Sequence, residues 1–322
     1  MAFTNTFKTF TITENERDNL HKILTKLKFE IIEIWTPDDN DEIEVWTNTK
    51  LKETLNIKIP KREHNSHKGN FGRVLVLGGS EGMGGAAILS SEASLYSGAG
   101  LTHLYTHPTN VEASLKRNPE IMSLGINSNF EIPYDIDVLV CGPGLGDDIW
   151  SKDVYEKIFQ NKNINTIILD AGALSFVNKF IKNILELESE LILTPHPGEA
   201  SKLLDVSIEE IQKDRPTAAI KISKKYCANV VLKGNRTLVC SKENLSLYEC
   251  LEGGPELSTG GTGDVLAGVI GGLVAQNNNA LDSCLLSVAA HSRSGKIFKE
   301  EIGEIGLNAS DLIYRIRELL NK

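Results

Sequence analysis

From about residue 73 onward, short runs of β-branched and other apolar residues alternate with longer segments whose apolar positions recur at helical spacing. This alternation is typical of the α/β class, a mostly parallel sheet flanked by helices. The predicted strands are residues 74–77, 101–106, 138–141, 166–169, 191–194, 230–232 and 236–240. Ligands gather beyond the carboxyl ends of strands in open α/β sheets, so we expect the loops after these strands to carry the chemistry.

Residues 1–47 follow a different pattern. Thr13 and Glu16 form a capping box ahead of a run with apolar residues at helical spacing, which predicts a short helix. Residues 30–35 and 42–46 alternate apolar and polar side chains around a turn-rich segment, which indicates a β-hairpin. We therefore expect a helix-hairpin appendage over residues 1–47, for oligomer contact or as a lid, and a main domain over residues 48–322.

Composition narrows the class of protein. The 322 residues, of which 41% are hydrophobic, fit one large α/β domain with a small appendage. A formal charge of -9 disfavours a phosphate-backbone partner such as DNA. Five widely spaced cysteines without a C-x-x-C pair indicate a reducing compartment. The N-terminus lacks signal-peptide features and no apolar stretch reaches the roughly 20 residues of a membrane span. We expect a cytoplasmic protein that binds neither nucleic acid nor a membrane.

The most specific motif is the G-G-T-G-D run of residues 260–264, which directly precedes an apolar segment with the pattern of a buried helix. Backbone amides at a helix N-terminus attract anions, and glycines let an anion approach them closely. Gly261, Thr262 and Gly263 therefore form a candidate phosphate cradle. Asp264, in the first helical turn, is the candidate base for a substrate hydroxyl. The alternative is that Asp264 only caps the helix and the glycines only make a turn.

Two further glycine-rich loops follow predicted strands. In the loop of residues 78–85, glycines permit close backbone approach to a ligand, and the small side chain of Ala86 leaves room for a flat ring. Tight packing is the alternative explanation for this loop. The loop of residues 142–146 places Gly144 near the same crevice.

Polar side chains follow three other strands. His196 lies between two prolines that stiffen its backbone, and its imidazole can donate to or accept from a polar substrate. Glu199 and Asp170 are candidates for holding a magnesium ion through water, and Asp170 can also cap the next helix. The segment between the last two predicted strands carries candidate nucleotide contacts, which are Lys233, Gly234, Asn235, Arg236 and Thr237.

These motifs together resemble one family. In addition to the G-G-T-G-D run, the chain carries H-K-G-N-F-G-R at residues 67–73, G-P-G-L-G at 142–146, D-A-G-A-L at 170–174, T-P-H-P-G-E at 194–199 and K-G-N-R-T at 233–237. Their order and identity resemble the NAD(P)H-hydrate dehydratases, a branch of the ribokinase-like superfamily. The resemblance covers residues from about 51 to the end.

The resemblance implies a ribokinase-like catalytic domain and a two-stage reaction. Asp264 takes the hydroxyl proton of a hydrated dihydronicotinamide while a phosphoryl group transfers to it from ADP or ATP. The ring nitrogen then expels phosphate and restores NADH or NADPH. The family implies substrate contacts at Ala86, Gly144, His196 and Asp264, with the nucleotide at residues 233–237 and Gly263. It also implies Mg²⁺, ADP as donor for a chain without a fused epimerase, a homo-oligomer, and a separate NAD(P)H-hydrate epimerase in the same pathway.

The sequence departs from the family pattern at two places. Where the family commonly carries G-N-P-G, this chain has Gly254, Pro255 and Glu256, and His291 is followed by polar residues instead of small apolar ones.

A small-molecule alcohol kinase of the vitamin-precursor type uses the same fold and the same aspartate, so it is the alternative function. A short-chain dehydrogenase requires Tyr-x-x-x-Lys, which no tyrosine satisfies, and a P-loop enzyme requires a G-K-[ST] that the chain lacks.

Overall fold

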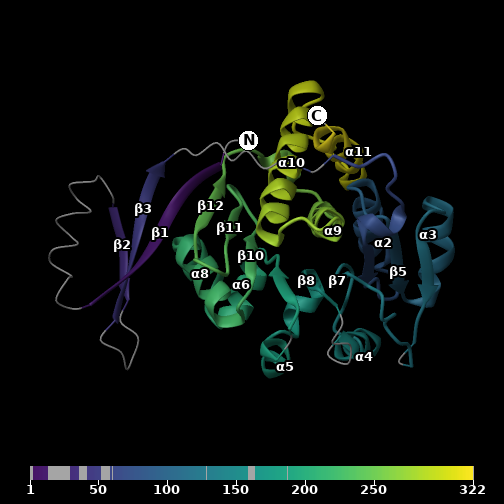
Figure 1. The fold of residues 1–322 in the computed structure, drawn as a ribbon, viewed down its shortest axis with the longest axis horizontal. Helices are drawn as coiled ribbons and strands as arrows, with labels where there is room; N and C mark the ends of the chain where they lie inside the picture. Colours follow the sequence, from purple (N-terminus) through teal and green to yellow (C-terminus); the bar gives the residue numbers. More distant parts are fainter. Residues whose placement is uncertain are drawn as a thin grey trace.

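The computed structural model describes residues 3–13, 30–35, 42–51, 59, 61–127, 129–158, 164–186 and 188–321, the first three stretches as backbone strands. Twelve strands form one sheet in the order β2-β3-β1-β12-β11-β10-β9-β8-β7-β4-β5-β6 (Figure 1). Their bounds are β1 Phe3–Thr13, β2 Glu30–Trp35, β3 Glu42–Leu51, β4 Arg73–Leu77, β5 Leu101–Thr106, β6 Met122–Gly125, β7 Val138–Cys141, β8 Thr166–Leu169, β9 Glu190–Leu193, β10 Asn229–Leu232, β11 Leu238–Cys240 and β12 Leu247–Cys250.

The strands from β10 to β6 in this order are parallel to their neighbours, whereas β11, β12, β1, β3 and β2 pair antiparallel. The mostly parallel sheet predicted from the sequence is therefore confirmed. Because the seven parallel strands point the same way, their carboxyl ends meet at one edge, and the loops with the candidate residues leave from that edge.

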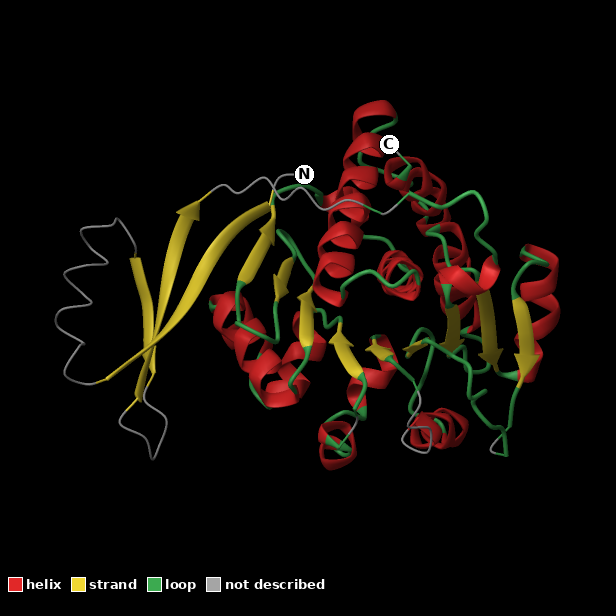
Figure 2. Ribbon diagram, in the orientation of Figure 1, coloured by secondary structure: helices red, strands yellow, loops and turns green. Residues whose placement is uncertain are grey.

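Helices cover both faces of the sheet (Figure 2). On one face lie α2 Gly84–Tyr96, α9 Thr262–Ala275 and α10 Ala280–Glu301, with α11 Ala309–Leu320 packed against α2 and α9. On the other lie α4 Ile149–Lys157, α5 Ile181–Leu185, α6 Pro197–Leu204, α7 Ile208–Lys213 and α8 Arg215–Tyr226. The short helix α3 Val111–Arg117 packs beside β6. No helix in the described part of the chain combines the length and apolar character needed to cross a lipid bilayer.

Successive side chains along a strand enter the two hydrophobic cores in turn. In β4, Leu75 and Leu77 belong to the core on the α8 side, whereas Val74 and Val76 belong to the core under α9. All four are fully buried. Strands covered on both faces read as continuous apolar runs, because each successive side chain enters one core or the other.

The structure differs from the predictions at the sheet's shorter strands. The last predicted strand begins at Leu238 instead of residue 236, because Arg236 has φ +58° and lies in a turn. The strands β6 and β12 were not predicted, since neither contains a β-branched residue that would signal a strand. The predicted strand 191–194 is shifted by one residue.

At the N-terminus, β2 and β3 pair antiparallel at the place of the predicted hairpin, and β1, which was not predicted, pairs with both β3 and β12. The predicted helix after Thr13 lies outside the described residues. The division into residues 1–47 and 48–322 stays a prediction.

Candidate active site

The glycine-rich loop opens helix α9 as the sequence predicted. Gly261 is the N-cap residue and has φ +94°, a conformation that L side chains rarely adopt. A Cβ at Gly261 would lie 2.9 Å from Leu89 Cδ1 and 3.0 Å from Ala309 Cβ. The loop is thus wedged between α2 and α11, where only glycine fits. The first amides of α9 have no partner within the helix, which leaves them available to an anion.

Two side chains, those of Thr262 and His291, hold this loop in place with three polar contacts. The Thr262 hydroxyl donates to the carbonyl oxygens of Leu257 at 3.1 Å and Thr259 at 3.0 Å. His291 Nε2 lies 3.0 Å from the Thr262 carbonyl oxygen. Burial lowers the pKa of His291 to about 4, so the ring is neutral and donates its Nε2–H to that carbonyl. Thr262 and His291 thereby hold the cradle in shape.

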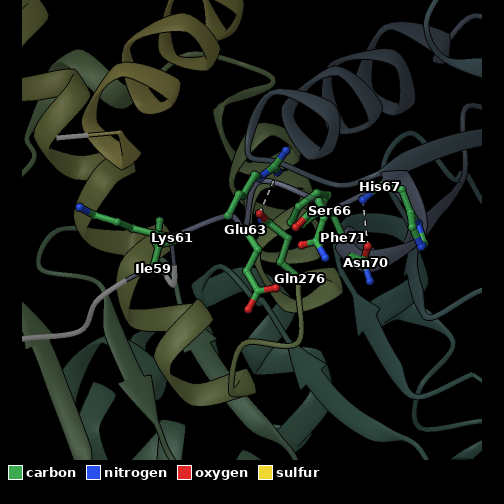
Figure 3. Close-up of a pocket in the computed structure, with 10 residues that line it drawn as sticks. Ile59, Lys61, Glu63, Ser66, His67, Asn70, Phe71 and Gln276 are labelled. Carbon is green, nitrogen blue, oxygen red and sulfur yellow. Dashed lines mark hydrogen bonds between the residues drawn. The ribbon is translucent and has the colours of Figure 1, made fainter.

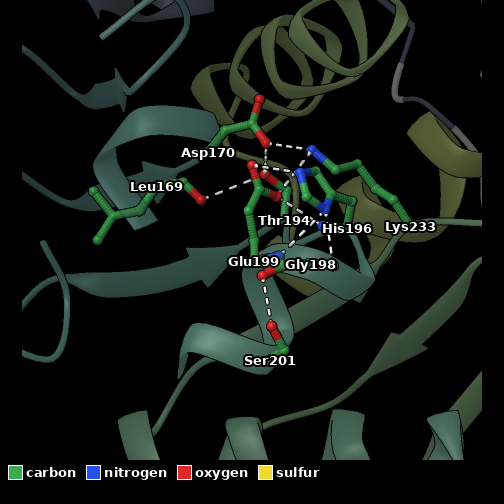
Figure 4. Close-up of polar contacts among 8 residues, drawn as sticks. All are labelled: Leu169, Asp170, Thr194, His196, Gly198, Glu199, Ser201 and Lys233. Atoms are coloured by element: carbon green, nitrogen blue, oxygen red, sulfur yellow. Dashed lines mark hydrogen bonds and ion pairs between the residues drawn. The ribbon is translucent and has the colours of Figure 1, made fainter. Parts of the chain in front are cut away.

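Lys233 forms ion pairs with two acidic residues of the site (Figure 4). Its Nζ lies 2.6 Å from Asp170 Oδ1 and 3.8 Å from Glu199 Oε2. The Thr194 hydroxyl donates to the same Asp170 oxygen at 2.7 Å. Asp170 is 1% exposed, and its other oxygen, Oδ2, is buried without a hydrogen-bond partner. The three strands β8, β9 and β10 therefore deliver one buried ionic cluster to the carboxyl edge of the sheet.

The electrostatics of this cluster bring the pKa values of two carboxyl groups to about 7. Burial, together with the charge of Asp170, raises the pKa of Asp264 to about 7, although Lys233 lowers it. Burial likewise raises the pKa of Glu199 to about 7 against the effect of Lys233. Burial works to lower the pKa of Lys233, but Asp170 and Glu199 outweigh it, so the net shift is upward. Lys233 stays charged, and Asp264 exchanges its proton in the range where a general base is effective.

His196 combines a structural contact with an exposed imidazole. It is the N-cap of α6, and its Nδ1 accepts from the amides of Gly198 at 3.0 Å and Glu199 at 3.2 Å. Glu199 Oε2 accepts from the His196 amide at 2.7 Å, which completes a capping box. Burial, followed by the charge of Lys233, lowers the pKa of His196. The side chain is still 56% exposed, and its Nε2 lies 3.3 Å from Glu199 Oε1.

Ala86 and Gly144, predicted to contact the substrate, lie together. Gly144 has φ +70°, and a Cβ there would lie 2.4 Å from the Met83 carbonyl oxygen and 3.3 Å from Ala86 Cβ. The buried Ser80 hydroxyl donates to the Gly144 carbonyl at 2.7 Å and joins the two loops. The two loops thus pack closely against each other, which requires a glycine at position 144.

The candidate nucleotide segment, residues 233–237, forms a turn between β10 and β11. Arg215 of α8 donates to the carbonyl oxygens of Leu232 at 3.1 Å and Lys233 at 3.3 Å, and also to that of Asn235. Arg236 forms an ion pair with Glu249 at 2.9 Å. Sequence reasoning missed Arg215, because a single arginine on a helix gives no local sign of the carbonyl oxygens it will bind.

The loop that departs from the family pattern carries a buried carboxylate. Glu256 is 2% exposed, and its Oε2 has no hydrogen-bond partner. A Cβ at Gly254 would lie 2.7 Å from this oxygen. Glu256 therefore occupies the space that a side chain at position 254 would need.

A pocket among the described residues lies away from this site. It measures about 610 Å³ and is lined by residues that include Arg62, His67 and Gln276 (Figure 3). These residues precede β4 or follow α9, so they lie at the amino ends of the parallel strands, opposite the loops of the candidate site. The family's opening segment, residues 67–73, thus contributes to that end of the domain.

The acidic residues suit a magnesium ion that is coordinated mainly by waters and by the phosphates of a bound nucleotide. No cluster of three or more His, Cys, Asp and Glu with metal-binding geometry occurs among the described residues. Mg²⁺ commonly uses one or two carboxylates together with waters and substrate phosphates. Glu199 and the unpartnered Asp170 Oδ2 provide such a pair.

Comparisons with known proteins show the family of this chain. The family described as NAD(P)H-hydrate dehydratase matches residues 74–318. An ADP-dependent (S)-NAD(P)H-hydrate dehydratase of Neisseria meningitidis is 35% identical over 265 residues, which cover 81% of this chain and 89% of the relative. The chain spans about half the length of the bifunctional NAD(P)H-hydrate repair enzymes that it also matches.

Two solved structures share the fold. One is an ADP/ATP-dependent NAD(P)H-hydrate dehydratase of Bacillus subtilis co-crystallised with ATP and Mg²⁺, with a TM-score of 0.73, 27% identity, and coverage of 82% of this chain and 95% of that one. The other is a ribokinase-like superfamily protein of Enterococcus faecalis, with a TM-score of 0.71, 28% identity, and coverage of 82% and 91%. The ribokinase-like fold is confirmed, and the chain belongs to the NAD(P)H-hydrate dehydratase family.

Proposed function

We propose that this protein dehydrates hydrated NADH or NADPH, with ADP as phosphoryl donor. A ring hydroxyl leaves poorly as hydroxide, whereas a phosphate ester leaves readily. Phosphorylation of the hydroxyl converts ADP to AMP. The ring nitrogen's lone pair then expels phosphate, and loss of a proton from the adjacent ring carbon restores the reduced nicotinamide. The balance is hydrated NAD(P)H plus ADP giving NAD(P)H, AMP and phosphate.

Asp264 accepts the proton of the substrate hydroxyl in the first stage. Its position in the first turn of α9 places the carboxylate beside the amides of the glycine loop. A pKa of about 7 leaves a substantial fraction ionised at neutral pH while keeping the group basic enough to take a proton. The observation that carries the proposal is this basic carboxylate at the mouth of a phosphate cradle.

Lys233 and the α9 amides balance the charge of the transferring phosphoryl group. A Cβ at Gly263 would lie 3.3 Å from Lys233 Nζ, so the ammonium group lies directly beside the cradle. Phosphoryl transfer depends mainly on positioning and electrostatic stabilisation, which a fixed cation and helix amides provide. Mg²⁺ bound near Glu199 and Asp170 would add charge neutralisation at the nucleotide phosphates.

His196, Ala86 and Gly144 form the proposed substrate surface. The exposed neutral imidazole of His196 offers a hydrogen bond without adding charge. Ala86 and Gly144 add two small residues that lie next to each other. The turn of residues 233–237 is the proposed nucleotide contact, with Lys233 and Thr237 as its polar side chains.

The proposal extends to the cellular context. ADP is the favoured donor, supported by the length-matched Neisseria relative, whose name is ADP-dependent. A separate NAD(P)H-hydrate epimerase is the proposed pathway partner, since the bifunctional relatives are about twice as long as the matched part. The described cysteines are all free thiols, which supports a reducing cytoplasm. A homo-oligomer stays a prediction.

The test is near-ultraviolet absorbance of reduced nicotinamide after mixing the protein with NADH hydrate, Mg²⁺ and ADP or ATP. We expect a rise that requires nucleotide, and a loss of about 10²–10⁴-fold in Asp264→Asn. An Asp205→Asn variant, changed at an exposed carboxylate, controls for the loss of one charge.

Phosphate and nucleotide are quantified in the same reaction. Release of phosphate and AMP in equal amounts with NADH supports the two-stage route. A stable phosphorylated product without a rise in absorbance would instead indicate an alcohol kinase and overturn the proposal.

A further inference from the structure

An aromatic pair, His107 and Trp150, borders the candidate site without a role in the reaction described above. The two ring centroids are 5.6 Å apart and the rings meet edge to face at 77°. The Trp150 indole N–H donates to the Ile126 carbonyl at 2.9 Å, and His107 Nδ1 lies 2.8 Å from the Thr109 hydroxyl. Both side chains are held at their polar edges and remain partly exposed.

The loops that carry this aromatic pair adjoin the loops of the proposed substrate surface. The His107 amide donates to the Gly79 carbonyl at 3.1 Å, and the Gly79 amide donates to the Pro143 carbonyl at 2.8 Å. Trp150 lies in the first turn of α4, directly after the loop that carries Gly144. A ligand that contacts the loops of Gly79 and Gly144 is therefore close to the loops that carry the aromatic pair.

Exposed apolar side chains surround the same place. Met83, in the loop of Ala86, is 55% exposed, and Ile149, the first residue of α4, is 78% exposed. Single exposed apolar residues are common, but several beside one crevice are typical of a binding surface. Met83 is the N-cap residue of α2, which carries Ala86, and Ile149 begins the helix that follows the Gly144 loop.

The distance between the ionic cluster and the aromatic pair matches the distance between the two bases of a dinucleotide. His107 follows β5, and Asp170 follows β8, with β4 and β7 between them. Three strand spacings of about 4.8 Å separate the two loops by roughly 14 Å along the edge of the sheet. A dinucleotide whose nicotinamide lies at the ionic cluster has its other base at about this separation.

We propose that His107 and Trp150 form the subsite for the adenosine half of the hydrated dinucleotide, with the adenine base packed against their exposed ring surfaces. This inference rests on the proposed function. Every base has a π-face, so stacking on an aromatic side chain recognises it without a set of hydrogen bonds. The pair acts on substrate affinity, and the reacting atoms lie elsewhere.

The test compares two substrates that differ only in this half. Hydrated NADH carries adenosine, whereas hydrated reduced nicotinamide mononucleotide does not. We expect Trp150→Ala to raise KM for NADH hydrate about 10-fold, with little change in kcat or in KM for ADP. KM for the mononucleotide hydrate stays unchanged. Trp150→Phe keeps an aromatic face and stays close to the wild type, which separates stacking from a folding defect.

A matched control is Tyr134→Ala, because Tyr134 is an aromatic residue with 82% exposure located before β7, at the other end of the sheet. It leaves both KM values unchanged. An equal rise in KM for both substrates in Trp150→Ala, or no rise for NADH hydrate, overturns the subsite while the proposed function stands. If the wild type turns over neither hydrate, the proposed function fails, and the subsite fails with it.

Discussion

Lys233 Nζ lies 2.6 Å from Asp170 Oδ1, although the two residues are 63 positions apart and leave strands separated by β9. Both side chains are largely buried. Removing one partner of a buried ion pair leaves the other charge uncompensated, which costs much more than the net value of the pair. Lys233 therefore acts on more than its buried partner, because its charge also lowers the pKa of Asp264 and Glu199.

Lys233→Met removes this cation and is expected to lower kcat/KM by at least about 100-fold, since a fixed charge beside the phosphoryl group is lost. Without Lys233, the pKa of Asp264 rises further, so the acid limb of the kcat/KM profile moves to higher pH. A pH profile of both proteins measures the displacement. Lys221→Met, at an exposed position of α8, is the control. An unshifted acid limb would argue against coupling between Lys233 and Asp264.

Asp264→Asn is expected to stabilise the fold at alkaline pH. The folded pKa of about 7 exceeds the ordinary value of 3.8, so the folded state binds more protons between these values. Stability from this group is present at low pH and is lost as the pH rises through about 7. Asparagine avoids that loss, which amounts to at most about 4 kcal/mol at pH 8. Urea unfolding at pH 5 and pH 8 measures it, and a gain of equal size at both values contradicts the buried carboxylate.

Gly144→Ala and Gly82→Ala separate a steric requirement from backbone strain. Both glycines have similar positive φ, +70° and +79°, but a Cβ at Gly144 would lie 2.4 Å from the Met83 carbonyl oxygen, whereas one at Gly82 meets nothing within 4 Å. We expect Gly82→Ala to cost about 1 kcal/mol of unfolding free energy and Gly144→Ala about 2–4 kcal/mol. Equal losses in thermal unfolding would mean that the 142–146 loop moves aside freely.

His196 variants distinguish helix capping from substrate contact. Asparagine is a good N-cap residue and alanine is a poor one, so His196→Asn keeps most of the stability while His196→Ala loses about 1 kcal/mol. Both variants lose the imidazole, and we expect both to raise KM for the dinucleotide hydrate. Thermal unfolding and steady-state kinetics on the same preparations provide the comparison. Full activity in His196→Asn would assign the histidine to capping alone.

The sequence by itself determined the parts of this protein that depend on local pattern. Strand periodicity predicted most of the parallel sheet, and the glycine run before an apolar segment predicted the N-terminus of α9 with Asp264 in its first turn. These features are local because helix starts and strand runs depend on neighbouring residues. The strands β6 and β12 lacked that signal, since neither contains a β-branched residue.

Only the tertiary structure decided which side chains meet. The order of the strands brings Asp170, Thr194 and Lys233 to one edge, and Arg215 reaches the carbonyl oxygens of the turn after β10 from a helix on the sheet's face. The pKa of Asp264 near 7 likewise comes from burial beside Asp170, which no spacing along the chain reveals. Contacts between distant segments and the loss of water around a charge arise only when the sheet assembles, so they become visible only in the folded chain.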